Sequence, residues 1–448
     1  MEHFATTLLT VILASYLVMT SIGKITLFRA LKLILAIHVL GDWVSDGYWQ
    51  SVPTYAYINA ITDDDRLVGN GLMLGCVVLT DFVQFIGNFV IKSGRNRSRE
   101  SSMMVATLAR PTGYSFIHFL LCVGLLLKLV IYWQIGWASV PEASLGSSGL
   151  LLIGEFLIPF SLAARHVRGG NRKSILMDIL FLGALSLISF SKAQVLFYLF
   201  HYSLTYIVIY GFQRLRSTIL NIKTLAIFLV LAVVVVSVKT QQRAGEQVEL
   251  SPTVIGGSVL SGTSMRLLGG IQRTYLTVVR EIIDNKAPLM DGSYTAQSLY
   301  LWIPRALWAD KPRIASEALY NYLNVTEEPY GTAFAINVYG ALLLDFGVIG
   351  LLISVFIFAI CLFLGEQMVR SKFVLFPATF ACPLQAFMRT AWWSLSIPLS
   401  EGGIPPAVTQ FAILTVIFAV LLVCYIPLRT IIQRLFLTAL RHRASAHL

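Results

Sequence analysis

Residues 337–364 read NVYGALLLDFGVIGLLISVFIFAICLFL, a run in which Asp345 is the only charged side chain. A helix needs about 20 mostly apolar residues to cross a bilayer, so this run is long enough to span one. Similar apolar runs fill most of the chain. Because runs of this length satisfy their backbone hydrogen bonds in lipid only as helices, the sequence predicts an all-α polytopic membrane protein.

The composition agrees with a membrane protein. The 448 residues are 56% hydrophobic and 13% charged, whereas soluble proteins average about 25% charged residues. All five cysteines fall in apolar runs, which excludes a disulfide framework or a zinc site with the usual spacing. The sequence contains no P-loop, HExxH, CxxC or GxSxG pattern. We therefore expect no metal and no cofactor.

We expect about eleven transmembrane helices, counted as runs close to the length of a bilayer crossing. The region 174–212 can form either a hairpin or a re-entrant pair. The expected spans are 4–20, 25–41, 71–91, 113–133, 149–164, 174–191, 194–212, 224–238, 337–364, 373–395 and 407–427.

Basic residues gather in alternate connections between these spans. Because Lys and Arg in short loops mark the cytoplasmic side, the pattern predicts a cytoplasmic C-terminus and an outer N-terminus. Much of the net charge of +11 is then a topology signal, and we expect no nucleic-acid partner. The basic stretches are 24–32, 92–110, 165–173, 214–223, 370–372 and 429–443.

One long segment interrupts the apolar pattern and divides the chain into three parts. Residues 1–238 form an N-terminal bundle of about eight spans, and 337–448 form about three spans with a basic tail. Residues 239–336 form a large outward-facing loop, which we expect to cap the membrane surface. The loop has nine basic and nine acidic residues, so its arginines are placed individually and do not form a cationic surface.

Residues 263–283 of the loop have helical periodicity. Arg266, Arg273 and Arg280 recur every seven residues, which places their side chains along one stripe. One interpretation is an amphipathic helix at the membrane surface with snorkelling arginines. The other is a row of guanidinium groups that binds a pyrophosphate, because guanidinium binds phosphate oxygens in a bidentate manner.

A bend follows this helix, because Pro304 and Pro312 each restrict the residue before them. The bend carries aromatic and basic side chains, which are suited to walls for sugar rings and charged lipid headgroups. The candidate substrate-binding residues here are Tyr294, Trp302, Arg305, Lys311 and Arg313.

Several ionisable residues lie inside the expected spans, where each costs about 2.5–3.5 kcal/mol unless it is paired or hydrated. Mutual pairing is one explanation, for example Asp178 with Lys192. A functional role is the other, and it applies best to His201, Asp345 and Arg389. The run Asp63–Asp65 in an outer connection is similar to the acidic metal motif of some membrane glycosyltransferases, but we expect it to be solvated.

Two stretches resemble the O-antigen polymerases of Wzy type, which polymerise oligosaccharide repeat units in bacteria. They are Ser293–Pro312, with its Ile-Pro-Arg…Trp…Lys-Pro bend, and Asn337–Gly350, with its Phe-Gly-x-x-Gly pattern. The resemblance implies a fold related to membrane glycosyltransferases of the GT-C class. It also implies glycan transfer from undecaprenyl pyrophosphate to another lipid-linked repeat unit, at the outer face of the bacterial inner membrane. A chain-length regulator protein would be a further partner.

For such a reaction we expect fixed cations at the pyrophosphate leaving group and a proton acceptor at the acceptor hydroxyl. The expected cations are Arg266, Arg273 and Arg305, with Arg389 as a fourth. The expected bases are Glu317, then Asp345, Glu328 or His201. An O-antigen ligase shares this donor chemistry and is one alternative. A transporter or flippase of lipid-linked oligosaccharides is another, although such folds commonly contain repeats and mid-membrane charges.

Overall fold

The structure is a computed structural model, and its described part is helical and contains no strand. Every structural statement about the chain refers to the residues that the structure describes. The described residues are 2–21, 26–46, 61–90, 105–106, 108–135, 145–187, 194–218, 230, 233–238, 240–241, 249, 251–267, 270–284, 286, 288–301, 303, 308, 336–370 and 378–445.

Five helices in this part are long and apolar enough to cross a membrane. They support a membrane protein, and they lie on five of the runs that hydropathy predicts. α9 (Arg172–Leu187) and α10 (Gln194–Tyr210) also lie on expected spans but are shorter. The five are α1 (Glu2–Ser21), α5 (Asp63–Val90), α7 (Pro111–Ile135), α17 (Val338–Arg370) and α20 (Ile404–Ser445).

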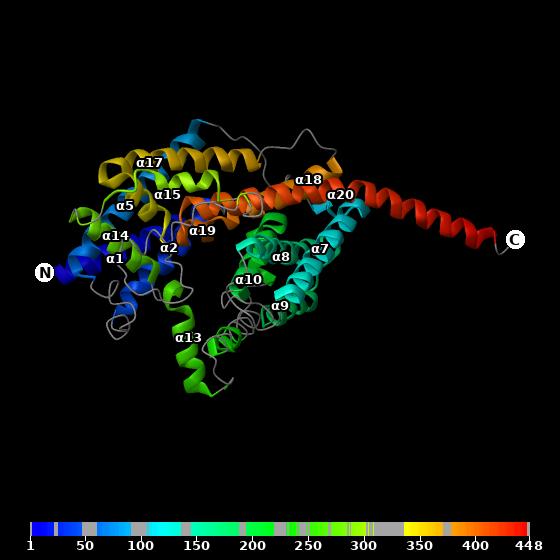
Figure 1. Cartoon of the computed structure of the whole chain (residues 1–448), viewed down its shortest axis with the longest axis horizontal. Coiled ribbons are helices and arrows are strands. Elements are labelled where there is room, and N and C mark those ends of the chain that lie inside the picture. The colour runs from blue at the N-terminus through cyan, green and yellow to red at the C-terminus, as the bar shows by residue number, and fades with distance from the viewer. Residues whose placement is uncertain are drawn as a thin grey trace.

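The helices gather in two groups (Figure 1). In the first group, α1, α2 (Leu27–Val44), α5, α17 and α14 (Gly270–Ile283) pack on one another. In the second group, α8 (Leu145–Ala164) packs on α7 and α10, and a smaller apolar core joins α8, α9 and α10. α18 (Ala378–Ser394), α19 (Ser396–Glu401) and α20 run between the groups.

Residues 239–336, which the sequence predicts to be an outward-facing loop, do not form only a surface cap. The predicted helix 263–283 is two helices, α13 (Pro252–Leu267) and α14, and residues 268–269 lie outside the described part. α14 is buried over most of its length between α2, α5 and α17. Gly69 of α5 allows this close approach, because an added Cβ would lie 2.3 Å from a side-chain carbon of Leu276. The expectation of an interfacial helix is therefore wrong for α14.

α17 is kinked at Gly347, which adopts φ 65° and ψ −174°. This conformation favours glycine, since a side chain at positive φ is strained. The kink falls in the Phe-Gly-x-x-Gly sequence directly after Asp345, and Leu289 packs within 3.1 Å of the position of a Gly347 Cβ. Asp345, just before the kink, faces residues 294–295 of the short helix α15 (Ser293–Ala296), which the 3-10 helix η3 (Gln297–Leu299) follows.

Candidate functional site

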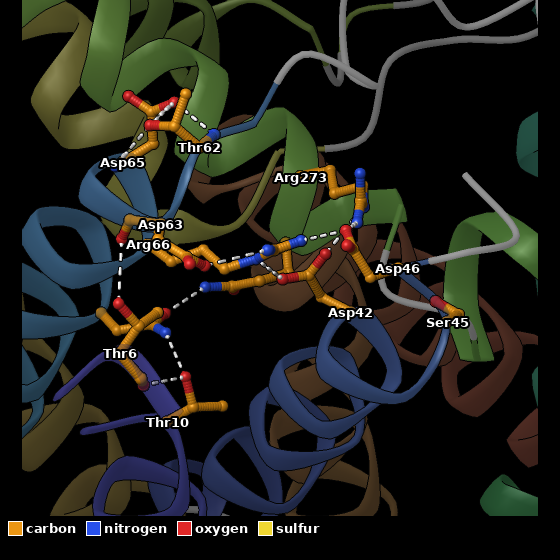
Figure 2. A network of polar contacts seen from close by, with 12 residues as sticks. Thr6, Thr10, Asp42, Ser45, Asp46, Thr62, Asp63, Asp65, Arg66 and Arg273 are labelled. Atoms are coloured by element: carbon orange, nitrogen blue, oxygen red, sulfur yellow. Dashed lines mark hydrogen bonds and ion pairs between the residues drawn. The ribbon is translucent and has the colours of Figure 1, made fainter. Parts of the chain in front are cut away.

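The first polar centre is a cluster of two arginines and two aspartates, largely buried except for one aspartate, Asp46, whose side chain is 36% exposed (Figure 2). Asp42 lies near the end of α2 and Asp46 just beyond it, while Arg66 begins α5 and Arg273 lies on α14. Arg273 Nε is 2.7 Å from Asp42 Oδ1, and Arg273 Nη2 donates a hydrogen bond to Asp46. Arg66 Nε donates to Asp42 Oδ2 at 3.1 Å, and Arg66 Nη2 donates to Asp46. Each arginine thus bridges both carboxylates.

Charge and burial show what this cluster does. The Arg273 side chain is 0% exposed, and the cluster contains two positive and two negative groups. Burial of Asp46 opposes its ionisation, but the hydrogen bonds from Arg66 and Arg273 outweigh burial and lower the pKa of Asp46. Arg273 therefore fixes α14 to α2, and its guanidinium is already occupied by carboxylates.

The acidic run Asp63–Asp65 lies beside this cluster and is only partly solvated, so the expectation of a solvated run holds in part. Asp63 contacts His3 Nδ1 at 3.0 Å and Arg66 Nη1 at 3.7 Å. Asp65 accepts hydrogen bonds from the backbone and the hydroxyl of Thr62, both at 2.8 Å, and so caps the start of α5. Asp64 is exposed.

Arg280 has a different environment from Arg273 although both lie on α14. Its Nη2 is 3.2 Å from Glu281 Oε1, and its Nη1 is 3.9 Å from Asp65 Oδ2. The arginines of the seven-residue stripe therefore meet carboxylates at two places on α14.

The second polar centre begins at Asp345. Its two carboxylate oxygens accept hydrogen bonds from the backbone N–H groups of Tyr294, at 2.9 Å, and Thr295, at 2.7 Å. Asp345 therefore holds the first turn of α15. The Tyr294 hydroxyl donates to the backbone oxygen of Gly402 at 2.9 Å, and burial raises the pKa of Tyr294. Tyr294 and Asp345, both predicted site residues, thus lie together.

Gly402 also lines a pocket of about 250 Å³, which α8 and α10 of the second group form with α18, α19 and α20. Its polar side chains come from five helices, and apolar rings of Phe156 and Phe197 complete the wall. The lining residues are Glu155, Phe156, Phe197, His201, Ser394, Ile397, Pro398, Glu401, Gly402, Pro406 and Gln410.

His201 is the predicted catalytic residue that the pocket contains. The side chain lies on α10 and is 8% exposed, and its ring centre is 5.1 Å from that of Phe156. Within the described residues, neither ring nitrogen has a hydrogen-bond partner. A buried polar group without a partner costs free energy, so such a group requires an explanation such as a ligand or a catalytic role.

Other polar side chains of the pocket are held in place. Gln410 Nε2 donates to Ser394 Oγ at 3.1 Å, and Glu155 Oε1 lies 3.9 Å from Lys128 Nζ. The mutual pairing predicted for intramembrane charges also occurs between Lys32 and Asp81 at 2.9 Å. Asp178 does not need the predicted partner Lys192, which lies outside the described part, because Asp178 binds Arg165 and His166.

Arg389 lies on α18, is half-buried and takes part in polar interactions. Arg266 belongs to α13, but its side chain is not described. The remaining predicted site residues lie outside the described residues. They are Trp302, Arg305, Lys311, Arg313, Glu317 and Glu328.

The sequence did not identify the carboxylate partners of Arg273 or the role of Glu401 and Gln410. Asp42 and Asp46 are four residues apart at a helix end, a spacing that places both on one face. That spacing is the one feature of the sequence that indicates a cation bound by both carboxylates. No local pattern marks Glu401 and Gln410, which reach the pocket through the packing of α19 on α20 and of α20 on α8. No protein-family model, curated protein or solved structure matches the chain.

Proposed function

We propose that this protein is a membrane glycosyltransferase that polymerises undecaprenyl-pyrophosphate-linked oligosaccharide repeat units into O-antigen or a similar surface polysaccharide. The observation that carries the proposal is the pocket among membrane helices, where His201, Glu155 and Glu401 offer proton-accepting groups beside apolar rings. The resemblance of the 293–350 region to repeat-unit polymerases supplies the substrate class. The proposed fold has about eleven spans related to the GT-C class. The proposed location is the bacterial inner membrane.

The reaction requires two chemical roles. A hydroxyl oxygen of the acceptor sugar forms a bond to the anomeric carbon of the donor glycan, and the bond from that carbon to the pyrophosphate oxygen breaks. The leaving undecaprenyl pyrophosphate keeps the electron pair, and the hydroxyl proton passes to a base, for which His201 is the best-placed described residue. The reaction uses no nucleotide. Cleavage of the donor's bond to pyrophosphate supplies the driving force.

The leaving group needs fixed positive charge. Arg273 is bound to Asp42 and Asp46, so we assign it to positioning α14 and not to direct pyrophosphate binding. Arg266, Arg305 and Arg389 keep that proposed role. Lys311, Arg313, Trp302 and Tyr294 are the proposed walls of the lipid-linked substrate site.

The proposal is tested by deleting the gene and analysing lipopolysaccharide and lipid-linked glycans. We expect lipid A–core to carry at most one repeat unit, with polymer restored by the wild-type gene. The purified protein should also extend an undecaprenyl-pyrophosphate-linked repeat unit in vitro. Full-length polymer accumulating on undecaprenyl pyrophosphate in the deletion strain would instead identify a ligase.

A flippase of lipid-linked oligosaccharides is the second candidate, and the buried Glu155–Lys128 contact favours it, since paired intramembrane charges often mark transport pathways. Proteoliposomes distinguish the two functions. A polymerase lengthens the glycan of a lipid-linked repeat unit, whereas a flippase moves it between leaflets and leaves its length unchanged.

A further inference from the structure

The charge of the pocket differs from that of the whole chain. The chain has a net charge of +11, yet among the lining side chains, all of which are described, none is Lys or Arg. Two carboxylates, Glu155 and Glu401, come from different helices. One cation, Lys128, lies behind the lining with its Nζ 3.9 Å from Glu155 Oε1. The pocket is therefore a poor site for a pyrophosphate or any other anion.

The remaining lining groups define what fits. Carboxylate oxygens, the His201 ring and the amide of Gln410 accept hydrogen bonds, which suits a ligand rich in hydroxyl donors. Phe156 and Phe197 provide apolar surface for the C–H faces of a sugar ring. At about 250 Å³ the pocket is below the roughly 300–1,000 Å³ of sites for drug-sized ligands, so it accommodates one sugar ring and not a longer glycan.

We infer that this pocket is a subsite for a single uncharged sugar, the terminal sugar of the acceptor glycan, and that it rejects acidic sugars such as uronic acids. The assignment of this sugar to the acceptor glycan rests on the proposed function, whereas the charge selectivity rests on the lining residues alone. Glu401 is a specificity-determining residue in this assignment, because its carboxylate repels an anionic ring.

The test is ligand-detected NMR on the full-length protein in nanodiscs of uncharged phosphatidylcholine. The probes are the methyl glycosides of N-acetylglucosamine and glucuronic acid. We expect the wild-type protein to bind the neutral glycoside about tenfold or more tightly than the uronide. If the net positive charge of the chain decided binding, the uronide would bind more tightly than the neutral glycoside. Charge of the whole chain and charge of the pocket therefore predict opposite orders of affinity.

Two variants sharpen the test. Glu401→Gln keeps the shape of the side chain and removes its charge, so we expect uronide binding to rise and the preference to shrink. Glu281→Gln removes a carboxylate on α14 that pairs with Arg280, away from the pocket lining, and should leave the preference unchanged. Equal binding of both glycosides to the wild-type protein, or no binding of either, would overturn the inference.

Because binding needs no turnover, this outcome is separate from the fate of the proposed function. Selective binding by a protein that shows no polymerisation would contradict the polymerase and retain the sugar subsite. Polymerisation without selectivity would retain the polymerase and remove the subsite.

Discussion

Arg273 and Asp42 form an ion pair of 2.7 Å that joins α14 to the end of α2, with the arginine side chain completely buried. The same arginine binds Asp46. Removing one partner of a buried pair leaves the other charge uncompensated, which costs roughly 3–5 kcal/mol. The cluster is therefore a structural connection between the segment 239–336 and the N-terminal helices.

We predict that Arg273→Gln lowers the Tm of the purified protein strongly, and that Arg273→Lys does so too. Lysine keeps the charge but lacks the planar fork that reaches both Asp42 and Asp46. Thermal unfolding in detergent measures the effect. Arg280→Lys is the matched control on the same helix, and we expect a change within about 1 kcal/mol because its ion pair is partly exposed.

The double variant Arg273→Gln/Asp42→Asn should recover part of the lost stability, because it removes the carboxylate that the single change leaves unpaired. An unchanged Tm in Arg273→Gln would show that the cluster does not hold α14. Loss of polymerisation at an unchanged Tm would instead support the direct role at the pyrophosphate that the sequence predicted for Arg273.

Asp46 gives a pH dependence whose sign follows from its lowered pKa. The folded-state pKa lies below the ordinary value of 3.8, so ionised Asp46 stabilises the fold above that pH. This contribution is lost as pH falls through the folded pKa. We expect the Tm difference between wild type and Asp46→Asn to stay constant from neutral pH to about pH 5 and to shrink below pH 4. A difference that already disappears between pH 7 and 5 would contradict this assignment.

Hydropathy predicted the helices well, and local chemistry predicted the contacts between them less well. The expected span 113–133 corresponds to α7 (Pro111–Ile135), and 337–364 to α17 (Val338–Arg370), because apolar length alone decides membrane insertion. The seven-residue arginine spacing predicts a pyrophosphate-binding row or snorkelling at the membrane surface, whereas the partners of Arg273 in the structure are protein carboxylates from a distant segment. Such pairing depends on tertiary packing, which periodicity does not report.

Asp345 can be tested as a positioning residue. Both of its oxygens accept backbone hydrogen bonds at the start of α15, so Asp345→Asn replaces one acceptor with a donor that faces an N–H group. We expect a loss of about 1–3 kcal/mol of stability. Activity per folded molecule should fall less than about tenfold if Asp345 only positions α15, because both of its oxygens already accept backbone hydrogen bonds. An unchanged Tm with a loss of activity of 10²-fold or more would restore Asp345 as a general base.

The orientation of the chain is a further prediction, based on the alternation of basic connections. A reporter that is active only in the periplasm should be inactive when fused after Arg443. The same reporter inserted within residues 239–336 should be active. The reverse pattern would place the outward loop in the cytoplasm, where undecaprenyl-linked repeat units are assembled and not polymerised, and would contradict the proposed function.

Two buried histidines allow the catalytic role of His201 to be separated from stability. His201 has no hydrogen-bond partner within the described residues, whereas His166 Nε2 lies 2.7 Å from the buried carboxylate of Asp178. His201→Gln removes no hydrogen bond of this structure, so we expect an almost unchanged Tm. If His201 accepts the hydroxyl proton, polymerisation of a lipid-linked repeat unit should slow by about 10²–10⁴-fold.

His166→Gln should behave in the opposite way, because it breaks a buried contact with Asp178 and lies outside the pocket. We expect its Tm to fall while activity per folded molecule is retained. Both variants should be assayed at equal amounts of folded protein, measured by size-exclusion chromatography in detergent. Wild-type rates for His201→Gln would remove His201 as the base and leave Glu317 and Glu328 as the next residues to test.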